Sequence, residues 1–292
     1  MRLALIVNPS AGGGRARRSL PAVQSALTGH GLEHHATFTE SLEHARALAH
    51  AAAAAGDAAV AFGGDGLIGA VAGALSESGG LLGVLPGGRG NDFARVLGIP
   101  LEPVPACAVL RNGNTRVLDL GEVAGRTFVG IASCGFDSVA NRIANETRLV
   151  RGNLVYAYGA LRALVRWRPA TFEVTLDDGR RHTVTGYTVA AANSSAYGGG
   201  MMMAPDASLQ DGLLDVVLIG DLPRRRFLAL LPTVFDGAHV RQANVEVLRS
   251  SEVTISASRP FTMYADGDPI ADLPVTVRVR PAAVRTLAPA IP

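Results

Sequence analysis

The chain has 292 residues, 48% of them hydrophobic, which is enough to bury the cores of two domains. Its net charge of +2 gives no bulk electrostatic sign of a nucleic-acid partner. All 27 basic residues are arginine, which excludes Walker-type NTPases and protein kinases, because both hold phosphates with a lysine.

The N-terminal half alternates apolar runs with helical patterns. Runs at 3–7, 33–38, 58–62 and 81–85 predict strands, and apolar residues at three- and four-residue spacing between them predict helices. Thr39 is a candidate N-cap for the helix that follows it. The alternation predicts an α/β domain with a doubly wound parallel sheet, in which ligands bind beyond the carboxyl ends of the strands.

Three glycine-rich loops follow three of these strands, at 8–14, 63–66 and 86–90. Glycines let the main chain approach a ligand closely, and the N-terminus of a following helix attracts phosphate. Asp65 lies inside the second loop, where its carboxylate would repel phosphate unless a cation lies between them. The loops therefore predict a nucleotide-phosphate site with Mg²⁺, while the alternative for any single loop is a tight turn without a ligand.

After about residue 116 the pattern changes to that of an antiparallel β domain. Asp177, Asp178 and Gly179 form a hairpin signal, and helical patterns at 151–168 and 223–237 interrupt the strands. The strands are predicted at 117–123, 127–133, 171–176, 183–192, 214–219, 253–258, 261–265 and 275–279.

We expect residues 1–116 to form the α/β domain, with the tail 283–292 as a candidate addition, and residues 117–282 to form the β domain. The N-terminus lacks the cleavage signal of a secretory peptide, and polar residues interrupt the alanine-rich run 47–62. A cytoplasmic protein is therefore expected, with a homodimer as a further candidate. Arginines of the stretch 162–168 predict either peripheral contact with the inner membrane face or a solvated helix face.

Five motifs then occur in the order typical of a known family. They are Asn8-Pro-Ser-Ala-Gly12, Gly63-Gly-Asp-Gly66, Pro86 with Gly90-Asn-Asp-Phe-Ala94, Ala204-Pro-Asp-Ala207 with Asp211-Gly212, and Asp266-Gly267. Together they resemble the bacterial diacylglycerol kinase family, relatives of eukaryotic diacylglycerol and sphingosine kinases, over nearly the whole chain. The resemblance implies an α/β nucleotide domain and a C-terminal antiparallel β-sandwich, with ATP and a lipid meeting in the cleft between them.

The resemblance also implies roles for single residues. Asp65 would face the Mg²⁺ of ATP, and Asp92 would support that site. The alternative for Asp92 is an acid in the first turn of a helix. Thr39 would contact ATP, and the alternative for it is an N-cap alone. The residues that would line ATP are Asn8, Pro9, Gly12, Thr39, Gly63, Gly64, Asp65, Gly66, Gly88, Arg89 and Asn91.

The chain departs from the family pattern in the nucleotide loops. Leu67, Gly69 and Ala70 stand where the family has a threonine and an Asn-Glu pair, and Arg89 stands where a threonine is usual. These changes remove polar contacts, although the Arg89 guanidinium can donate to a phosphate instead.

Two further sites fall in the β half. Ser208 and Leu213, through backbone carbonyls, and Asp211 resemble a loop that holds a structural Mg²⁺; the alternative is an ordinary Asp-Gly turn. The stretch from Tyr197 to Met203 predicts either core packing by methionines or a wall of the lipid cleft.

A lipid hydroxyl needs a general base, and the family supplies a glutamate in an Asp-Gly-Glu motif. This chain reads Asp266-Gly267-Asp268, so Asp268 is the predicted base, and the alternative is a hairpin turn. The sequence thus predicts an ATP- and Mg²⁺-dependent kinase of a lipid alcohol, with diacylglycerol as the first candidate. The alternatives are a small-molecule kinase similar to NAD kinase and a non-catalytic lipid- or nucleotide-binding relative.

Overall fold

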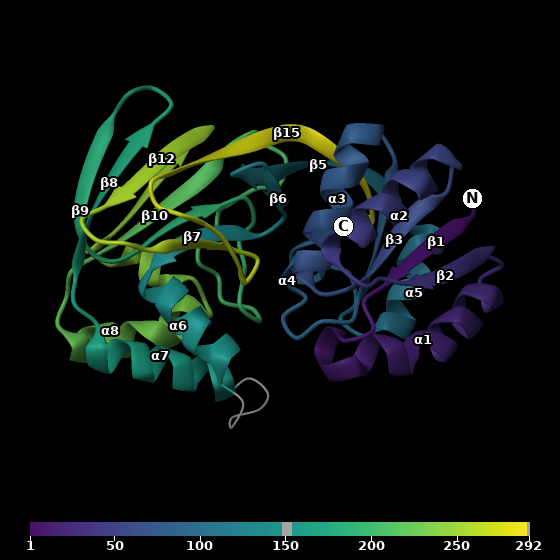
Figure 1. Ribbon diagram of the computed structural model, residues 1–292, viewed down its shortest axis with the longest axis horizontal. Coiled ribbons are helices and arrows are strands. Elements are labelled where there is room, and N and C mark those ends of the chain that lie inside the picture. Colours follow the sequence, from purple (N-terminus) through teal and green to yellow (C-terminus); the bar gives the residue numbers. More distant parts are fainter. Residues whose placement is uncertain (148–153, 291–292) are drawn as a thin grey trace.

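The computed structural model describes residues 1–147 and 154–290. Figure 1 shows two halves, an α/β half that contains the N-terminus and a β-rich half, joined by two long neighbouring strands, β5 and β15. Within the described ranges, no helix combines the length and apolar character needed to cross a membrane.

Four parallel strands in the order β4-β3-β1-β2 form the N-terminal sheet, with α2 and α3 on one face and α1 and α5 on the other (Figure 1). This is the predicted doubly wound arrangement. The bounds are β1 Leu3–Val7, α1 Ala11–Gly29, β2 His34–Phe38, α2 Leu42–Ala54, β3 Ala58–Gly63, α3 Asp65–Ser78, β4 Leu81–Pro86, α4 Asp92–Val96 and α5 Pro103–Asn112.

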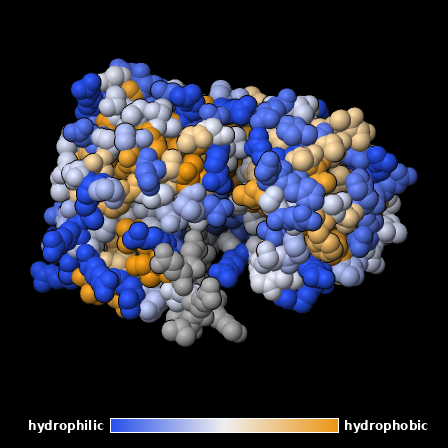
Figure 2. Space-filling view, in the orientation of Figure 1, coloured by the Kyte–Doolittle hydropathy of each residue, from blue (hydrophilic) through white to orange (hydrophobic). Residues whose placement is uncertain are grey.

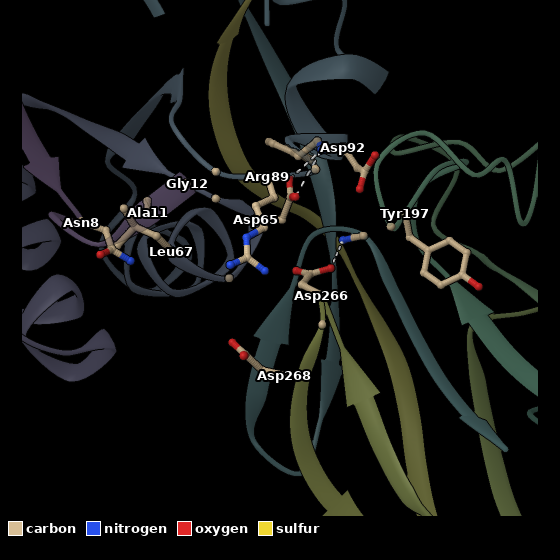
Figure 3. A pocket seen from close by; sticks show the side chains of 18 of the residues that line it. Asn8, Ala11, Gly12, Asp65, Leu67, Arg89, Asp92, Tyr197, Asp266 and Asp268 are labelled. Carbon is tan, nitrogen blue, oxygen red and sulfur yellow. Dashed lines mark hydrogen bonds between the residues drawn. The ribbon is translucent and has the colours of Figure 1, made fainter. Parts of the chain in front are cut away.

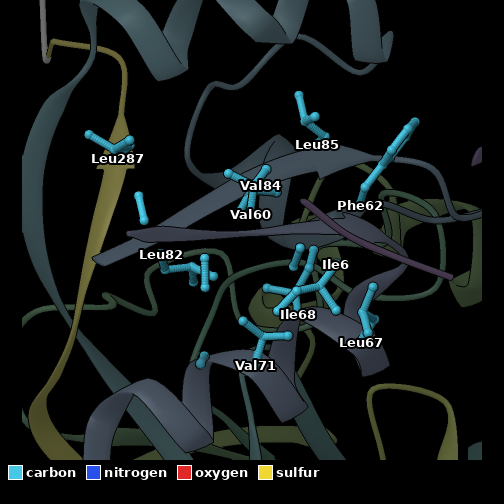
Figure 4. Close-up of a cluster of buried hydrophobic side chains, with 14 of the residues drawn as sticks. Ile6, Val60, Phe62, Leu67, Ile68, Val71, Leu82, Val84, Leu85 and Leu287 are labelled. Atoms are coloured by element: carbon cyan, nitrogen blue, oxygen red, sulfur yellow. The ribbon is translucent and has the colours of Figure 1, made fainter. Parts of the chain in front are cut away.

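The central strands are apolar throughout because helices cover both faces of the sheet. Every residue of β1 and β3 is buried, and Phe62 packs in the same cluster as Ile68 and Val71 of α3 (Figure 4). Leu287 of β15, more than 200 positions away in the sequence, belongs to this core as well. The C-terminal end of the chain therefore stabilises the N-terminal sheet.

The first two helices begin later than their local sequence signals indicate. Gly12, Gly13 and Gly14 have φ of 57°, 66° and 86°, so the loop after β1 extends to Gly14 and regular helix follows it. The N-cap predicted at Thr39 is wrong. Ser41 caps α2 by accepting from the His44 N–H at 3.0 Å, while the Thr39 hydroxyl donates to the Ser41 carbonyl.

The C-terminal half is antiparallel and sandwich-like, as expected, and a β8–β9 hairpin turns at the predicted Asp177–Gly179 signal. The bounds are β5 Asn114–Val123, β6 Arg126–Phe128, β7 Ile131–Gly135, α6 Phe136–Glu146, α7 Leu154–Arg166, β8 Ala170–Leu176, β9 Arg181–Ala192, β10 Leu214–Gly220, α8 Arg224–Leu230, the 3₁₀ turns η1 Leu231–Val234 and η2 Ala238–Arg241, β11 Val245–Ser250, β12 Glu252–Ala257, β13 Thr262–Ala265, β14 Asp268–Asp272 and β15 Val275–Ala288.

Two predicted elements of this half are divided. The single strand predicted at 127–133 is two strands, because the N–H groups of Val129 and Gly130 donate to the Asp266 carboxylate instead of to a strand. The helix predicted at 223–237 ends at Leu230 and continues as a 3₁₀ turn, since Pro232 cannot donate an α-helical hydrogen bond. The first three residues of the predicted helix 151–168 lie outside the described residues.

Strand β15 continues well beyond its predicted end at residue 279. It pairs with β12 and β5 and then, at Arg285 and Thr286, in parallel with β4 of the N-terminal sheet. The predicted domain division at residue 116 stays a prediction, because β5 and β15 run side by side through both halves.

Candidate active site

A cleft of about 560 Å³ lies between the two halves. The glycine loops after β1, β3 and β4 form one side, and the β13–β14 turn with residues 196–198 forms the other (Figure 3). Its polar lining includes Asn8, Ser10, Asp65, Arg89, Asp92, Asn141, Tyr197, Asp266 and Asp268. The three loops that the sequence singled out therefore meet at one place.

The loops after β3 and β4 approach each other so closely that only glycine fits. A Cβ on Gly88 would lie 2.5 Å from the Gly64 Cα. Asn91 has φ of 53°, and its Oδ1 accepts the Gly88 N–H at 2.8 Å, which fixes the shape of the second loop. The glycine backbones of these loops thus line a narrow cleft, in which a phosphate can approach the main chain closely.

Asp65, at the first turn of α3, is tied to the neighbouring loop. Its two carboxylate oxygens accept the N–H groups of Asp92 at 3.2 Å and Phe93 at 3.0 Å. Burial raises the pKa of Asp65, and these hydrogen bonds oppose that rise. A carboxylate can accept about four hydrogen bonds, so lone pairs remain for a cation.

Asp92 links the two halves of the molecule. Its Oδ2 accepts the Gly199 N–H at 2.8 Å. Its Oδ1 is buried and has no hydrogen-bond partner within the described residues, while the Arg95 Nε lies 3.8 Å away. Burial and the nearby Asp65 charge raise the pKa of Asp92 to about 6. Asp92 is therefore more than a first-turn helix acid.

Asp266 occupies the turn between β13 and β14 with φ of 49°. Its carboxylate accepts the N–H groups of Val129 and Gly130, both at 2.9 Å. Burial, followed by repulsion from Asp65, raises the pKa of Asp266 to about 7. Both oxygens hold backbone, so the residue positions the turn that carries Asp268.

Asp268 is the least restrained of the four carboxylates. A Cβ on Gly66 would lie 2.9 Å from its Oδ2, which places the carboxylate beside the α3 N-terminus. The residue is exposed, and its side chain makes no hydrogen bond in the described part of the chain. Desolvation of the carboxyl raises the pKa of Asp268 above its usual value, which moves it toward that of an effective base.

Arg89 supplies positive charge in this acidic cleft. It is the one cationic side chain among the described residues that line the cleft, and it makes no ion pair with any of them. Figure 3 shows its guanidinium extending into the space beside Asp65 and Asp266. The position suits a charged donor to phosphate oxygens.

The acidic residues fit a Mg²⁺ that arrives with a nucleotide. Across the described residues, no group of three or more metal-ligating side chains is close enough to hold an ion alone. Magnesium needs only one or two carboxylates when substrate phosphates and waters complete its coordination. The unpartnered Asp92 Oδ1, near Asp65, offers such a ligand.

The residues predicted to line ATP divide into those that line the cleft and those that do not. Asn8, Gly12, Gly64, Gly66 and Gly88 line the cleft together with Asp65 and Arg89. Pro9, Thr39, Gly63 and Asn91 do not line it. Their contacts with ATP stay predictions; Asn91 shapes the loop, as described above.

The predicted structural metal loop already contains a positive charge. The Asp211 carboxylate accepts the Leu213 N–H at 3.1 Å and forms an ion pair with Arg249, which also contacts Asp215 at 3.2 Å. A cation on Asp211 would have to displace this guanidinium, so the loop as it stands does not fit one. The Mg²⁺ role of Ser208, Asp211 and Leu213 stays an untested prediction.

An apolar cavity of about 490 Å³ adjoins the cleft in the β half. The two share Asn141, Tyr197 and Gly198. Met201 and Met203 line the cavity, and Met203 also belongs to the buried core of the β half, so both alternatives for this stretch stay predictions. Most of the cavity wall was not predicted. That wall is Phe136, Ala140, Ala160, Ile219, Phe227, Leu228, Leu230, Leu231, Pro232, Val234 and Phe235.

Both halves of the chain match models of known protein families. A family model described as "Diacylglycerol kinase catalytic domain" matches residues 2–123, and one described as "YegS C-terminal NAD kinase beta sandwich-like domain" matches residues 130–288. The chain is similar to the diacylglycerol kinase of Mycobacterium tuberculosis, with 34% identity over 99% of this chain and 95% of the relative. It is 29% identical to the diacylglycerol kinase of Bacillus subtilis over 91% of this chain and 89% of that one.

Solved structures agree at the level of the fold. A diacylglycerol kinase from Bacillus anthracis superimposes with a TM-score of 0.74 at 18% identity, covering 98% of this chain and 96% of that one.

Proposed function

Since this chain belongs to the diacylglycerol kinase family, we propose that it transfers the γ-phosphoryl group of ATP, with Mg²⁺, to the hydroxyl of diacylglycerol or a closely related lipid alcohol. One observation carries this proposal: the polar cleft of glycine loops and carboxylates adjoins an apolar cavity, with which it shares lining residues. A phosphoryl donor and a lipid acceptor can meet only where such surfaces adjoin.

The N-terminal loops bind the phosphates. Backbone N–H groups of the loops around Gly12 and Gly64 surround them, and the Arg89 guanidinium adds a charged donor. Asp65 and Asp92 hold Mg²⁺, which neutralises phosphate charge when bound. Because little covalent chemistry falls to the protein in phosphoryl transfer, this positioning supplies most of the catalysis.

Asp268 accepts the proton of the lipid hydroxyl. Its carboxylate makes no hydrogen bond with the residues that the structure describes, whereas both oxygens of Asp266 accept backbone N–H groups. Its position beside Gly66 places the base at the α3 N-terminus, next to the phosphate loop. The hydroxyl oxygen attacks the γ-phosphorus, ADP leaves, and the proton passes to the Asp268 carboxylate.

The apolar cavity favours a lipid over NAD as the acceptor. Its volume lies within the range of small-molecule sites, and its wall is largely aliphatic and aromatic. An acyl chain loses water on entering it, whereas the polar groups of NAD would find few partners there.

The test is a transfer assay with γ-labelled ATP and Mg²⁺ against diacylglycerol, monoacylglycerol, a long-chain amino alcohol and NAD. We expect label in diacylglycerol and none in NAD. Label in NAD alone would establish the small-molecule alternative, and ATP binding without any labelled product would establish the non-catalytic alternative.

A further inference from the structure

Tyr197 lies at the junction of the polar cleft and the apolar cavity. Among the described residues, Tyr197, Asn141 and Gly198 line both spaces. Tyr197 is half-buried, and its hydroxyl makes no hydrogen bond with a residue that the structure describes. A tyrosine hydroxyl inside a protein usually has a partner, because leaving it without one costs free energy. We therefore expect the partner of this hydroxyl to come with a ligand.

The backbone that carries Tyr197 is held on both sides. Tyr197 and Met201 exchange two backbone hydrogen bonds of 2.9 Å, which close the loop between them. The glycines at 198–200 have φ between 62° and 106°, a conformation that favours glycine. The Gly199 N–H also donates to the Asp92 carboxylate, which ties the loop to the N-terminal half. The tyrosine ring is therefore preorganised at the junction.

The Tyr197 hydroxyl is suited to donate a hydrogen bond. Burial, followed by the charges of Asp137 and Asp92, raises the pKa of Tyr197 well above its usual value, so the phenol keeps its proton. The Asp137 Oδ1 accepts the Ser138 N–H at 3.1 Å and the Thr188 hydroxyl at 3.4 Å. Thr188 and Asp137, which also line the cavity, thus satisfy each other, whereas the phenol O–H stays available.

The cavity has two different ends. Tyr197 and Asn141 lie at the end shared with the cleft, whereas Leu228 and Phe235 line the cavity and are 44% and 59% exposed. Figure 2 shows hydrophobic residues among hydrophilic ones on the surface over α7 and α8. A lipid whose hydroxyl reacts in the cleft has its chains along the apolar wall. The first polar group behind that hydroxyl then lies beside Tyr197.

We propose that the Tyr197 hydroxyl donates a hydrogen bond to the ester carbonyl next to the reacting hydroxyl of the lipid acceptor. This inference rests on the proposed function and adds a substrate class to it: an alcohol whose neighbouring carbon carries an acyl ester. The carbonyl oxygen accepts the phenol O–H, and the acyl chain behind it enters the cavity. An ether lipid lacks this carbonyl, so it leaves the phenol unpaired in a filled cavity.

The first experiment compares three acceptors of equal chain length in detergent micelles with γ-labelled ATP: a 1,2-diacylglycerol, a 1-alkyl-2-acylglycerol and a 1,2-dialkylglycerol. Wild type should use the two lipids with an ester at position 2 equally well. Its kcat/KM for the diether should be about fivefold lower, which corresponds to one neutral hydrogen bond of about 1 kcal/mol. Tyr197→Phe keeps the ring and should lose this preference, with the KM for ATP unchanged.

Tyr158→Phe is the matched control. It makes the same change on α7 at a residue outside the cavity lining, where the hydroxyl accepts the Arg162 guanidinium at 3.2 Å. It should keep the wild-type ratio of ester to ether. The same ratio in Tyr197→Phe and wild type would overturn the proposal and make the Asn141 amide the next donor to test. An equal loss for all three lipids in Tyr197→Phe would also overturn it, because the hydroxyl would then act on a group that they share.

Binding measured without chemistry separates this inference from the proposed function. Calorimetric titration with 1,2-dihexanoylglycerol and 1,2-dihexylglycerol, below their critical micelle concentrations, requires neither ATP nor transfer. Wild type should bind the diester about fivefold more tightly than the diether, and Tyr197→Phe should bind both alike. This pattern without labelled product from any lipid would contradict the proposed function alone. Transfer to both lipids without an ester preference in wild type would contradict the inference alone.

Discussion

The polar cleft and the apolar cavity adjoin, yet they are built in different ways. Each wall of the phosphate side of the cleft is a short loop with its own local signal, such as the glycine turn around Asp65. The cavity wall comes from segments far apart in the sequence, from α6 to just after η1, and most of its residues have only their apolar character in common. The donor half of the reaction is therefore visible in local motifs, whereas the acceptor half exists only in the folded chain.

The largest expected effect is on the cleft side. Asp65→Asn should lower turnover on the order of 1,000-fold, because the amide cannot hold a cation beside the phosphates, while its oxygen can still accept one α4 N–H. Steady-state kinetics over a Mg²⁺ titration measure the loss, and thermal unfolding checks the fold. Asp206→Asn, at an exposed site, is the matched control. Turnover close to wild type in the Asp65 variant would remove the metal role.

Arg89→Ala tests whether the Arg89 guanidinium binds the phosphoryl donor or the lipid acceptor. Loss of one charged hydrogen bond, about 1.5 kcal/mol, should raise the KM for ATP on the order of tenfold and leave that for the lipid unchanged. Arg111→Ala, exposed at the end of α5, controls for a general change in charge. A rise in the lipid KM alone would move Arg89 to the other substrate.

The cavity can be filled without touching the cleft. Ala160→Phe places a ring in the cavity wall and displaces one or two methylene groups of an acyl chain, each contributing about 0.8 kcal/mol. The KM for long-chain diacylglycerol should rise roughly four- to fifteenfold in detergent micelles, with the KM for ATP unchanged. Val247→Phe adds its ring at an exposed site of β11 and should behave like wild type.

The smallest effect concerns stability and a carboxylate in the cavity wall. Burial raises the pKa of Asp137 to about 6, from 3.8 in the unfolded chain. The folded state therefore binds this proton more tightly, so its contribution to stability is present below about pH 4 and is lost as pH rises through 6.

The measurement is chemical unfolding of wild type and Asp137→Asn at pH 5 and pH 8. Relative to the variant, wild type should lose on the order of 1–3 kcal/mol between these pH values. A constant difference between the two proteins would show that Asp137 does not titrate in this range.

Sequence patterns predicted the parallel strands and glycine loops because each depends on local residue types. They did not predict that Asp65 would hold the N–H groups of α4, since that contact spans 27 positions. The break between β6 and β7 was missed for a similar reason: Asp266 accepts the N–H of Val129 from 137 positions away.

Two other differences show where local patterns lack information. Strand β11, Val245–Ser250, is short, and its apolar residues are mixed with charged ones. The alternation of apolar and polar residues is therefore too brief to predict a strand. The Asp211 loop matches a metal-binding pattern, but Arg249, 38 positions later, already pairs with its carboxylate. In both cases a distant partner determines the local structure: β10 pairs with β11, and Arg249 pairs with Asp211.

The central claim is that the Asp268 carboxylate of the β half activates a lipid hydroxyl beside ATP bound by the other half. Single-turnover transfer from γ-labelled ATP to diacylglycerol by Asp268→Asn and Asp268→Glu, with ATP affinity measured in parallel, tests it most directly. We predict a loss of at least about 100-fold for the asparagine variant at unchanged ATP affinity, with measurable transfer for the glutamate variant. Transfer by Asp268→Asn near the wild-type rate would contradict the account and make Asp266 the next carboxylate to test.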